Sequence, residues 1–116
     1  MLIEFFITGC FNDKRDDCLL PLARSLFDRL TTDVDVCPSP DEPIALTVDG
    51  FCIMATEIDR YFSYDAPADG KEGKAYYTYN LGGIDIVEYG DKYEETIREL
   101  KEKERLSRLD WEKLRK

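Results

Sequence analysis

The sequence predicts a single α+β domain that spans residues 1–116. We expect a mixed or antiparallel sheet of five or six strands with two helices, in the order β-α-β-β-β-β-β-α. Three observations predict this fold class: an apolar run of β-branched and aromatic residues at the start of the chain, one stretch with helical periodicity, and an Asp-Gly turn between two apolar segments. A chain of 116 residues also has the size of one ordinary domain.

The first two elements are a strand and a helix. Residues 2–8 are nearly all apolar, which is typical of a strand in the middle of a sheet. The helix is predicted by apolar side chains at positions 19, 22, 23, 26, 27 and 30, which is the spacing of one helix face. Asp16 or Asp17 is a suitable N-cap, and Pro21 fits only the first helical turn, where backbone N–H groups lack partners within the helix.

A short strand, a loop and a hairpin follow. Residues 33–37 alternate in polarity, as a strand does, and three prolines make 38–43 a loop. Residues 44–48 and 51–58 form the clearest hairpin in the chain, because the Asp-Gly pair between them accepts the positive φ of a type I′ turn.

A second hairpin is predicted near the end of the sheet. Its strands are residues 75–79 and 84–89, with Asn-Leu-Gly-Gly at 80–83 as the turn. Residues 65–73 before it are rich in Asp, Ala, Pro and Gly, so we expect a mobile loop there.

The C-terminal segment 91–116 is predicted to be helical. Ile97 lies on one face of that helix, whereas Leu106 and Leu109 lie on nearly the opposite face. One straight helix cannot bury both faces in one chain. We therefore expect either that the helix breaks near Ser107, where a second cap is available, or that its end contacts another chain, which would make the protein a homodimer.

Composition excludes several classes of function. Acidic residues outnumber basic ones by 25 to 16, and residues 1–90 alone hold 17 acidic and 7 basic residues. Direct binding to nucleic acid or to an anionic membrane needs a basic patch, so we expect neither. The chain has no histidine, which removes Ser-His-Asp and Cys-His catalysis and histidine zinc sites. We therefore expect no enzyme activity, no cofactor and no metal.

The N-terminal residues and the cysteines predict a cytoplasmic protein, in the host cytoplasm if the protein is viral. The segment 1–9 has no basic region and no cleavage site of a signal peptide. The four cysteines contain no C-x-x-C pair, so we expect four reduced thiols.

Two weaker interpretations concern chemistry. Cys10 lies between the first strand and the first helix, where a helix N-terminus and basic neighbours can activate a thiol, so a small cysteine-dependent redox enzyme is an alternative. Asp33 and Asp35 share one strand face and Glu72 precedes a strand, but a magnesium-dependent nuclease also needs basic DNA contacts that the acidic body lacks.

The distribution of tyrosines indicates a binding surface. All seven tyrosines lie between positions 61 and 93, and tyrosine is frequent in protein–protein contacts. The densest group lies on one predicted strand beside an acidic loop, so we expect the partner to contact Tyr76, Tyr77, Tyr79, Asp65, Asp69 and Glu72. Neighbours on a strand point to opposite sides, so at least one of the three tyrosines must face the core.

These observations predict a small acidic, non-enzymatic protein that binds and inhibits a protein partner. Its dispersed carboxylates can imitate the phosphate field of nucleic acid, so the partner is expected to be a basic protein that handles nucleic acid. Small size, acidity and lack of histidine are shared with phage-type inhibitors such as anti-CRISPR and anti-restriction proteins. They are shared equally with immunity proteins that neutralise toxins, which are the alternative.

Overall fold

The computed structural model describes residues 1–70 and 72–114 of the chain. Lys71 of the predicted loop and residues 115–116 of the predicted helical segment therefore lie outside the described residues. The elements, with η1 a 3₁₀ helix, are β1 (Leu2–Ile7), η1 (Lys14–Leu19), α1 (Leu20–Phe27), β2 (Thr31–Asp33), β3 (Ile44–Val48), β4 (Phe51–Asp65), β5 (Lys74–Glu88) and α2 (Gly90–Leu114). The predicted α+β class is confirmed, with the order β-α-β-β-β-β-α and one strand fewer than the predicted order.

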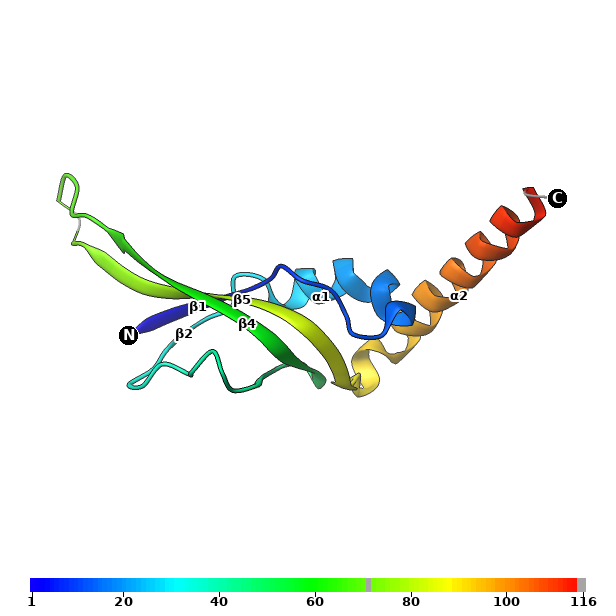
Figure 1. Cartoon of the computed structure of the whole chain (residues 1–116), viewed down its shortest axis with the longest axis horizontal. Helices are drawn as coiled ribbons and strands as arrows, with labels where there is room; N and C mark the ends of the chain where they lie inside the picture. Colours follow the sequence, from blue (N-terminus) through cyan, green and yellow to red (C-terminus); the bar gives the residue numbers. More distant parts are fainter. Residues whose placement is uncertain (71, 115–116) are drawn as a thin grey trace.

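The five strands form one mixed sheet in the order β2-β1-β5-β4-β3. β1 and β5 are parallel, and the other neighbours are antiparallel. Figure 1 shows the β4–β5 hairpin reaching toward one end of the molecule and α2 toward the other. The molecule is accordingly elongated, with extents of 62 × 27 × 26 Å.

The core lies on one side of the sheet. Burial alternates along β1, where every second side chain is buried. α1 covers this side with Ala23 and Phe27, and the ring of Phe27 lies 5.8 Å from that of Phe51. The first turn of α2 packs there too, with Tyr93 5.7 Å from Phe51. Both α-helices therefore cover the same side, which we call the helix face; the opposite side is the open face.

The helical region after β1 begins earlier than predicted. Asp13, rather than Asp16 or Asp17, is the N-cap, and its carboxylate accepts a hydrogen bond of 3.0 Å from the backbone N–H of Arg15. The reason is that residues 14–19 form a 3₁₀ helix before α1 starts. Pro21 lies in the first turn of α1, as predicted.

The predicted strand at 33–37 is displaced toward the N-terminus. β2 covers only Thr31–Asp33 and pairs with the first half of β1. The N-terminal ammonium donates hydrogen bonds to the Asp33 carboxylate at 2.8 Å and to the Val34 carbonyl at 2.9 Å. The backbone N–H of Val34 also donates a 2.9 Å hydrogen bond to the Met1 carbonyl, and the residues after Val34 form no further strand before β3.

The Asp-Gly hairpin is confirmed. Asp49 and Gly50 have φ values of 50° and 83°, and Val48 pairs with Phe51. The turn also holds the start of α2, because Lys92 forms a 2.9 Å ion pair with Asp49.

The second predicted hairpin is wrong, because residues 74–88 form one continuous strand, β5. Its partner is β4, which continues through Asp65 instead of ending at 58. The glycines at 82 and 83 do not turn the chain but change which residues face the core. Leu81 before them and Ile84 after them are both fully buried, although regular alternation would place them on opposite faces.

The same change of face occurs on β4. Its core residues are Phe51, Ile53 and Ala55 up to this point, and the even-numbered residues from Ile58 onward take over the helix face. Where the faces change, the Thr56 hydroxyl donates a 3.0 Å hydrogen bond to the Gly83 carbonyl. In a sequence, two glycines that interrupt the alternation look like a turn, which explains why a turn was predicted at residues 80–83.

α2 is one unbroken helix, so the predicted break near Ser107 is wrong. Ion pairs between residues three or four apart, Arg105 with Glu102 and Arg108 with Glu104, support the helix through this region. In the part of the chain that the structure describes, neither α2 nor α1 has the length and apolar character needed to cross a membrane.

We expect Gly83→Ala to destabilise the protein more than Gly70→Ala. Both glycines have positive φ, 57° and 75°, which costs another residue about 1–2 kcal/mol. A Cβ at position 83 would also lie 2.7 Å from the Thr56 Oγ1, whereas a Cβ at position 70 meets nothing within 4 Å. Urea unfolding of both variants measures the difference, and equal losses of stability would contradict the role assigned to Gly83.

Candidate functional site

None of the described helices covers the open face of the sheet, and this face is acidic. Its carboxylates come from four neighbouring strands, and the one basic side chain that the described strands place there is Lys74. The other basic strand residue, Arg60, lies on the helix face, where it stacks 5.1 Å from the ring of Tyr77. The carboxylates of the open face are Asp33 on β2, Glu4 on β1, Glu57, Asp59 and Asp65 on β4, and Asp85 on β5.

Aromatic side chains lie among these carboxylates. Tyr61 on β4 is 52% exposed, and Tyr76 on β5 is half-buried beside Leu2, its β1 partner. The Lys74 ammonium lies 5.3 Å from the centre of the Tyr76 ring. The open face therefore combines carboxylates with partly exposed aromatic rings, which are the residue types that anchor protein interfaces.

A shallow hollow of about 250 Å³ lies at the middle of this face. Glu57, Asp59 and Asn80 line it together with the backbone of Gly9 and Gly82. The two glycines allow the β1 end to approach β5 closely, because a Cβ on Gly9 would lie 2.6 Å from the Gly82 Cα. Two carboxylates and an amide at one hollow form a site that accepts hydrogen bonds from an ammonium or a guanidinium group.

The structure does not bring the six predicted partner-binding residues onto one surface. Tyr79 is fully buried on the helix face; its hydroxyl donates a 2.6 Å hydrogen bond to the Pro38 carbonyl, and its ring lies 5.7 Å from Phe5. Tyr77 is half-buried on the same face, against Phe62 at 5.4 Å. The expectation that at least one of the three tyrosines faces the core is thus met by Tyr79.

The other four predicted residues are accessible. Tyr76 lies on the open face, and Asp65 ends β4 on that face opposite Lys74. Asp69 and Glu72 are exposed in the loop between β4 and β5. We call residues 59–65 of β4 and 74–78 of β5 the distal arm. Tyr76 and Asp65 belong to this arm, and Asp69 and Glu72 lie in the loop at its tip.

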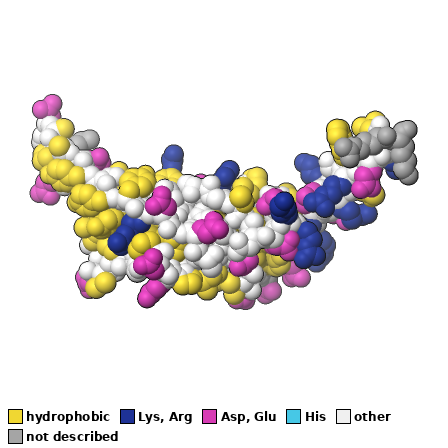
Figure 2. Space-filling model, viewed as in Figure 1, with side chains coloured by type: hydrophobic (Ala, Val, Ile, Leu, Met, Phe, Trp, Pro, Cys, Tyr) yellow, Lys and Arg dark blue, Asp and Glu magenta, His cyan; other side chains and the backbone are white. Residues whose placement is uncertain are grey.

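Sequence reasoning missed the aromatic residues that β4 contributes to the distal arm. Tyr61, Phe62 and Tyr64 are each more than half exposed. The signal was present, because residues 61–64 hold three aromatic side chains, a residue type that favours strands. Figure 2 shows hydrophobic side chains over this end of the molecule and basic side chains gathered along α2 at the other end.

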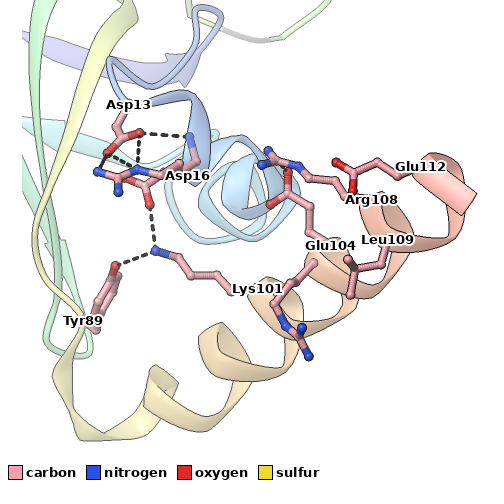
Figure 3. A pocket seen from close by; sticks show the side chains of 10 residues that line it. Asp13, Asp16, Tyr89, Lys101, Glu104, Arg108, Leu109 and Glu112 are labelled. Atoms are coloured by element: carbon pink, nitrogen blue, oxygen red, sulfur yellow. Dashed lines mark hydrogen bonds and ion pairs between the residues drawn. The ribbon is translucent and has the colours of Figure 1, made fainter.

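A second, larger hollow of about 640 Å³ lies between η1 and α2 (Figure 3). It contains as many acidic as basic side chains. The Lys101 ammonium, which points toward η1, donates to the Asp16 carboxylate at 2.9 Å and to the Tyr89 hydroxyl at 3.5 Å. Arg15 pairs with Asp13 at 2.9 Å.

These charges are already paired with one another. The Asp16 carboxylate raises the pKa of Lys101, and Arg15 lowers the pKa of Asp13. An anion in this hollow would have to compete with carboxylates that are part of the fold. The side chains of this hollow therefore join α2 to η1, and we do not assign a ligand to it.

The four cysteines, all in the described part of the chain, are free thiols, as predicted. Cys10 is exposed, whereas Cys18 is half-buried beneath α2. Burial, assisted by the nearby Glu104 carboxylate, raises the pKa of the Cys18 thiol to about 11.

The carboxylates considered for metal chemistry lie apart. Asp33 is held by the N-terminal ammonium, and Asp85 accepts a 3.1 Å hydrogen bond from the Asn12 amide. Among residues 1–70 and 72–114, no three Asp, Glu or Cys side chains gather as a metal site requires. Comparisons of the chain with family models, curated proteins and solved structures found no match.

Alanine substitution should separate the core tyrosine from the surface tyrosine. We expect Tyr79→Ala to lose about 3–5 kcal/mol of unfolding free energy, because it leaves a cavity and removes the shorter of the two hydrogen bonds to the Pro38 carbonyl, the other being from Arg60. Tyr76→Ala should lose about 1 kcal/mol or less, as a cross-strand surface pair does. Urea unfolding measures both, and a Tyr76→Ala variant as unstable as Tyr79→Ala would contradict the assignment of faces.

The thiols should react at different rates. At pH 8 the raised pKa leaves Cys18 with roughly a hundredfold less thiolate than an ordinary cysteine, so iodoacetamide should label Cys18 at least about tenfold more slowly than Cys10. Mass spectrometry of the labelled peptides measures both rates, and the denatured chain serves as the control in which they converge. Equal rates in the folded protein would show that Cys18 is not shielded.

Proposed function

We propose that the protein is a non-enzymatic inhibitor that binds a basic, nucleic-acid-handling protein through the open face of its sheet. The observation that supports this is the distribution of charge: six carboxylates and a single lysine lie on the one face of the sheet that no described helix covers. A basic protein surface is the complement of such a face.

The excess of negative charge favours fast association with a basic partner. Residues 1–90 hold 17 acidic and 7 basic residues, so their field adds to that of the open face. At physiological salt this attraction acts over a Debye length of about 8 Å, and it raises the association rate more than the lifetime of the complex. Binding should therefore weaken as salt increases.

The central hollow gives the inhibition a chemical basis. An arginine or lysine that normally contacts a phosphate has the geometry to bind the carboxylates of Glu57 and Asp59 instead. While that side chain occupies the hollow, the partner cannot use it to hold nucleic acid. In this proposal, the carboxylates at the hollow take the place of a phosphate for one basic side chain of the partner.

Aromatic rings next to the hollow supply the apolar part of the interface. Charge alone gives little specificity, and desolvated aromatic anchors carry much of the binding energy in protein interfaces. Tyr61 and Tyr76 lie on the open face toward the distal arm, and Asp65, Asp69 and Glu72 continue the acidic surface to its tip. Tyr77 and Tyr79 take no part in this contact.

Two kinds of inhibitor share this physics. A phage-type inhibitor, such as an anti-CRISPR or anti-restriction protein, would block a nuclease of host defence, whereas an immunity protein would block a toxin. The identity of the captured partner separates them. A redox enzyme centred on Cys10 is the remaining alternative, and it requires Cys10 to react faster in the folded protein than in the denatured chain of the labelling experiment.

The test is affinity capture from the native host, with mass spectrometry of the retained proteins and an assay of their nucleic-acid activity. We expect the retained protein to be basic, its activity to fall when the chain is added, and its retention to decrease between 50 and 500 mM salt, a span of roughly tenfold. The variant Glu57→Lys/Asp59→Lys should reduce the association rate at least about tenfold.

The matched control is Asp41→Lys/Glu42→Lys, which makes the same change of charge in the exposed loop between β2 and β3. It should retain most of the affinity. Equal losses in both double variants would mean that only net charge matters, and binding of a partner unaffected by either variant would reject the open face as the interface.

A further inference from the structure

One side of the outer half of α2 has no covering element within the described chain. Leu106 and Leu109 are 49% and 40% exposed, and a helical repeat of 3.6 residues places them on the side opposite Ile97, which is buried against the body. Glu102 lies one turn before Leu106 on this side, and Lys113 one turn after Leu109. The side thus presents two leucines between an acidic and a basic residue, and we call it the outer stripe.

We propose that a second copy of this chain covers the outer stripe, in an antiparallel helix pair whose twofold axis passes between Ser107 and Arg108. In this register Leu106 lies opposite the partner subunit's Leu109, and Leu109 lies opposite the partner subunit's Leu106. The four leucines form two apolar layers at the centre of the pair. This contact goes beyond the proposed function and does not depend on it.

Charge complementarity selects this register. Glu102 lies opposite the partner's Lys113, and by symmetry Lys113 lies opposite the partner's Glu102. The flanking residues match as well: Lys103 lies beside the partner's Asp110 on one flank, and Arg105 beside the partner's Glu112 on the other. In this segment, each charged residue of the outer stripe or beside it meets a residue of opposite sign on the partner helix. Flanking ion pairs of this kind set the orientation of helices in coiled coils.

The parallel arrangement is disfavoured by the same residues. It would place Glu102 opposite the partner's Glu102 and Lys113 opposite the partner's Lys113, and like charges at such a seam repel. Within the described chain, η1 joins α2 through Asp16 and Lys101, just before the paired segment begins at Glu102. Leu109 borders the hollow between η1 and α2, so the partner helix would lie beside that hollow.

The contact is short, so the dimer should be weak. Thirteen residues from Glu102 to Leu114 make a smaller interface than the roughly 1,200–2,000 Å² of a stable complex. We expect half-dissociation at a concentration well above that of a stable complex but within the range that sedimentation equilibrium reaches.

Charge exchange between two variants tests both the partner and the direction of the helices. Glu102→Lys and Lys113→Glu should each be monomeric at concentrations where the wild type dimerises, because each places like charges across the seam. A one-to-one mixture of the two variants restores both opposite-charge contacts, so it should dimerise at least as well as the wild type. Sedimentation equilibrium at several loading concentrations measures all of these.

Controls separate the contact from changes in net charge or folding. Glu95→Lys changes the charge by the same amount on an exposed part of α2 outside the paired segment, and it should dimerise like the wild type. Because Glu102→Lys also removes the ion pair with Arg105 within the helix, circular dichroism should show a small loss of melting temperature for that variant and unchanged melting for Lys113→Glu and Glu95→Lys. A wild type that stays monomeric at millimolar concentration, a Glu102→Lys variant that still dimerises, or association of Glu102→Lys with the wild type in preference to Lys113→Glu would each overturn the proposal.

Discussion

The change of face at Gly82 and Gly83 determines how the rest of the molecule is arranged. Because these glycines and the Thr56–Gly83 hydrogen bond shift the alternation by one residue, β5 supplies the helix face with Leu81 on one side and Ile84 on the other. Without the shift, one half of β5 would point its apolar residues away from α1. The compact core and the distal arm therefore both depend on this one change of face.

A core on only one side of the sheet leaves the second side to interact with water. Carboxylates on that side keep a single-layer sheet in solution, since flat apolar faces and free strand edges lead to aggregation. The same carboxylates produce the electrostatic field on which the proposed interface relies. Contact with water and the proposed recognition of a partner therefore both depend on the charges of Glu57 and Asp59, and a substitution that removes charge there affects both.

The predictable parts of the fold have local causes. The helical spacing from Leu19 to Phe27 and the Asp49-Gly50 turn each follow from a few neighbouring residues, and both are present. The errors need distant partners to resolve: Gly82-Gly83 continues a strand, and does not turn the chain, only because β4 extends beside it, and the burial of Tyr79 depends on Pro38, 41 residues away. The open face as an acidic surface was equally hidden, because it joins residues of β2, β1, β5 and β4.

The parallel pairing of β1 with β5 has a consequence for how the chain acquires its structure. Leu2 pairs with Tyr76 and Ile7 with Leu81, so the first strand to be synthesised finds its central neighbour only after most of the chain exists. The β3–β4 hairpin needs only adjacent residues and can form early, whereas closing the long loop between β1 and β5 costs more chain entropy and slows the reaction. During translation the apolar strand Leu2–Ile7 therefore remains without its β5 partner while the middle of the sheet assembles, and its docking completes the sheet.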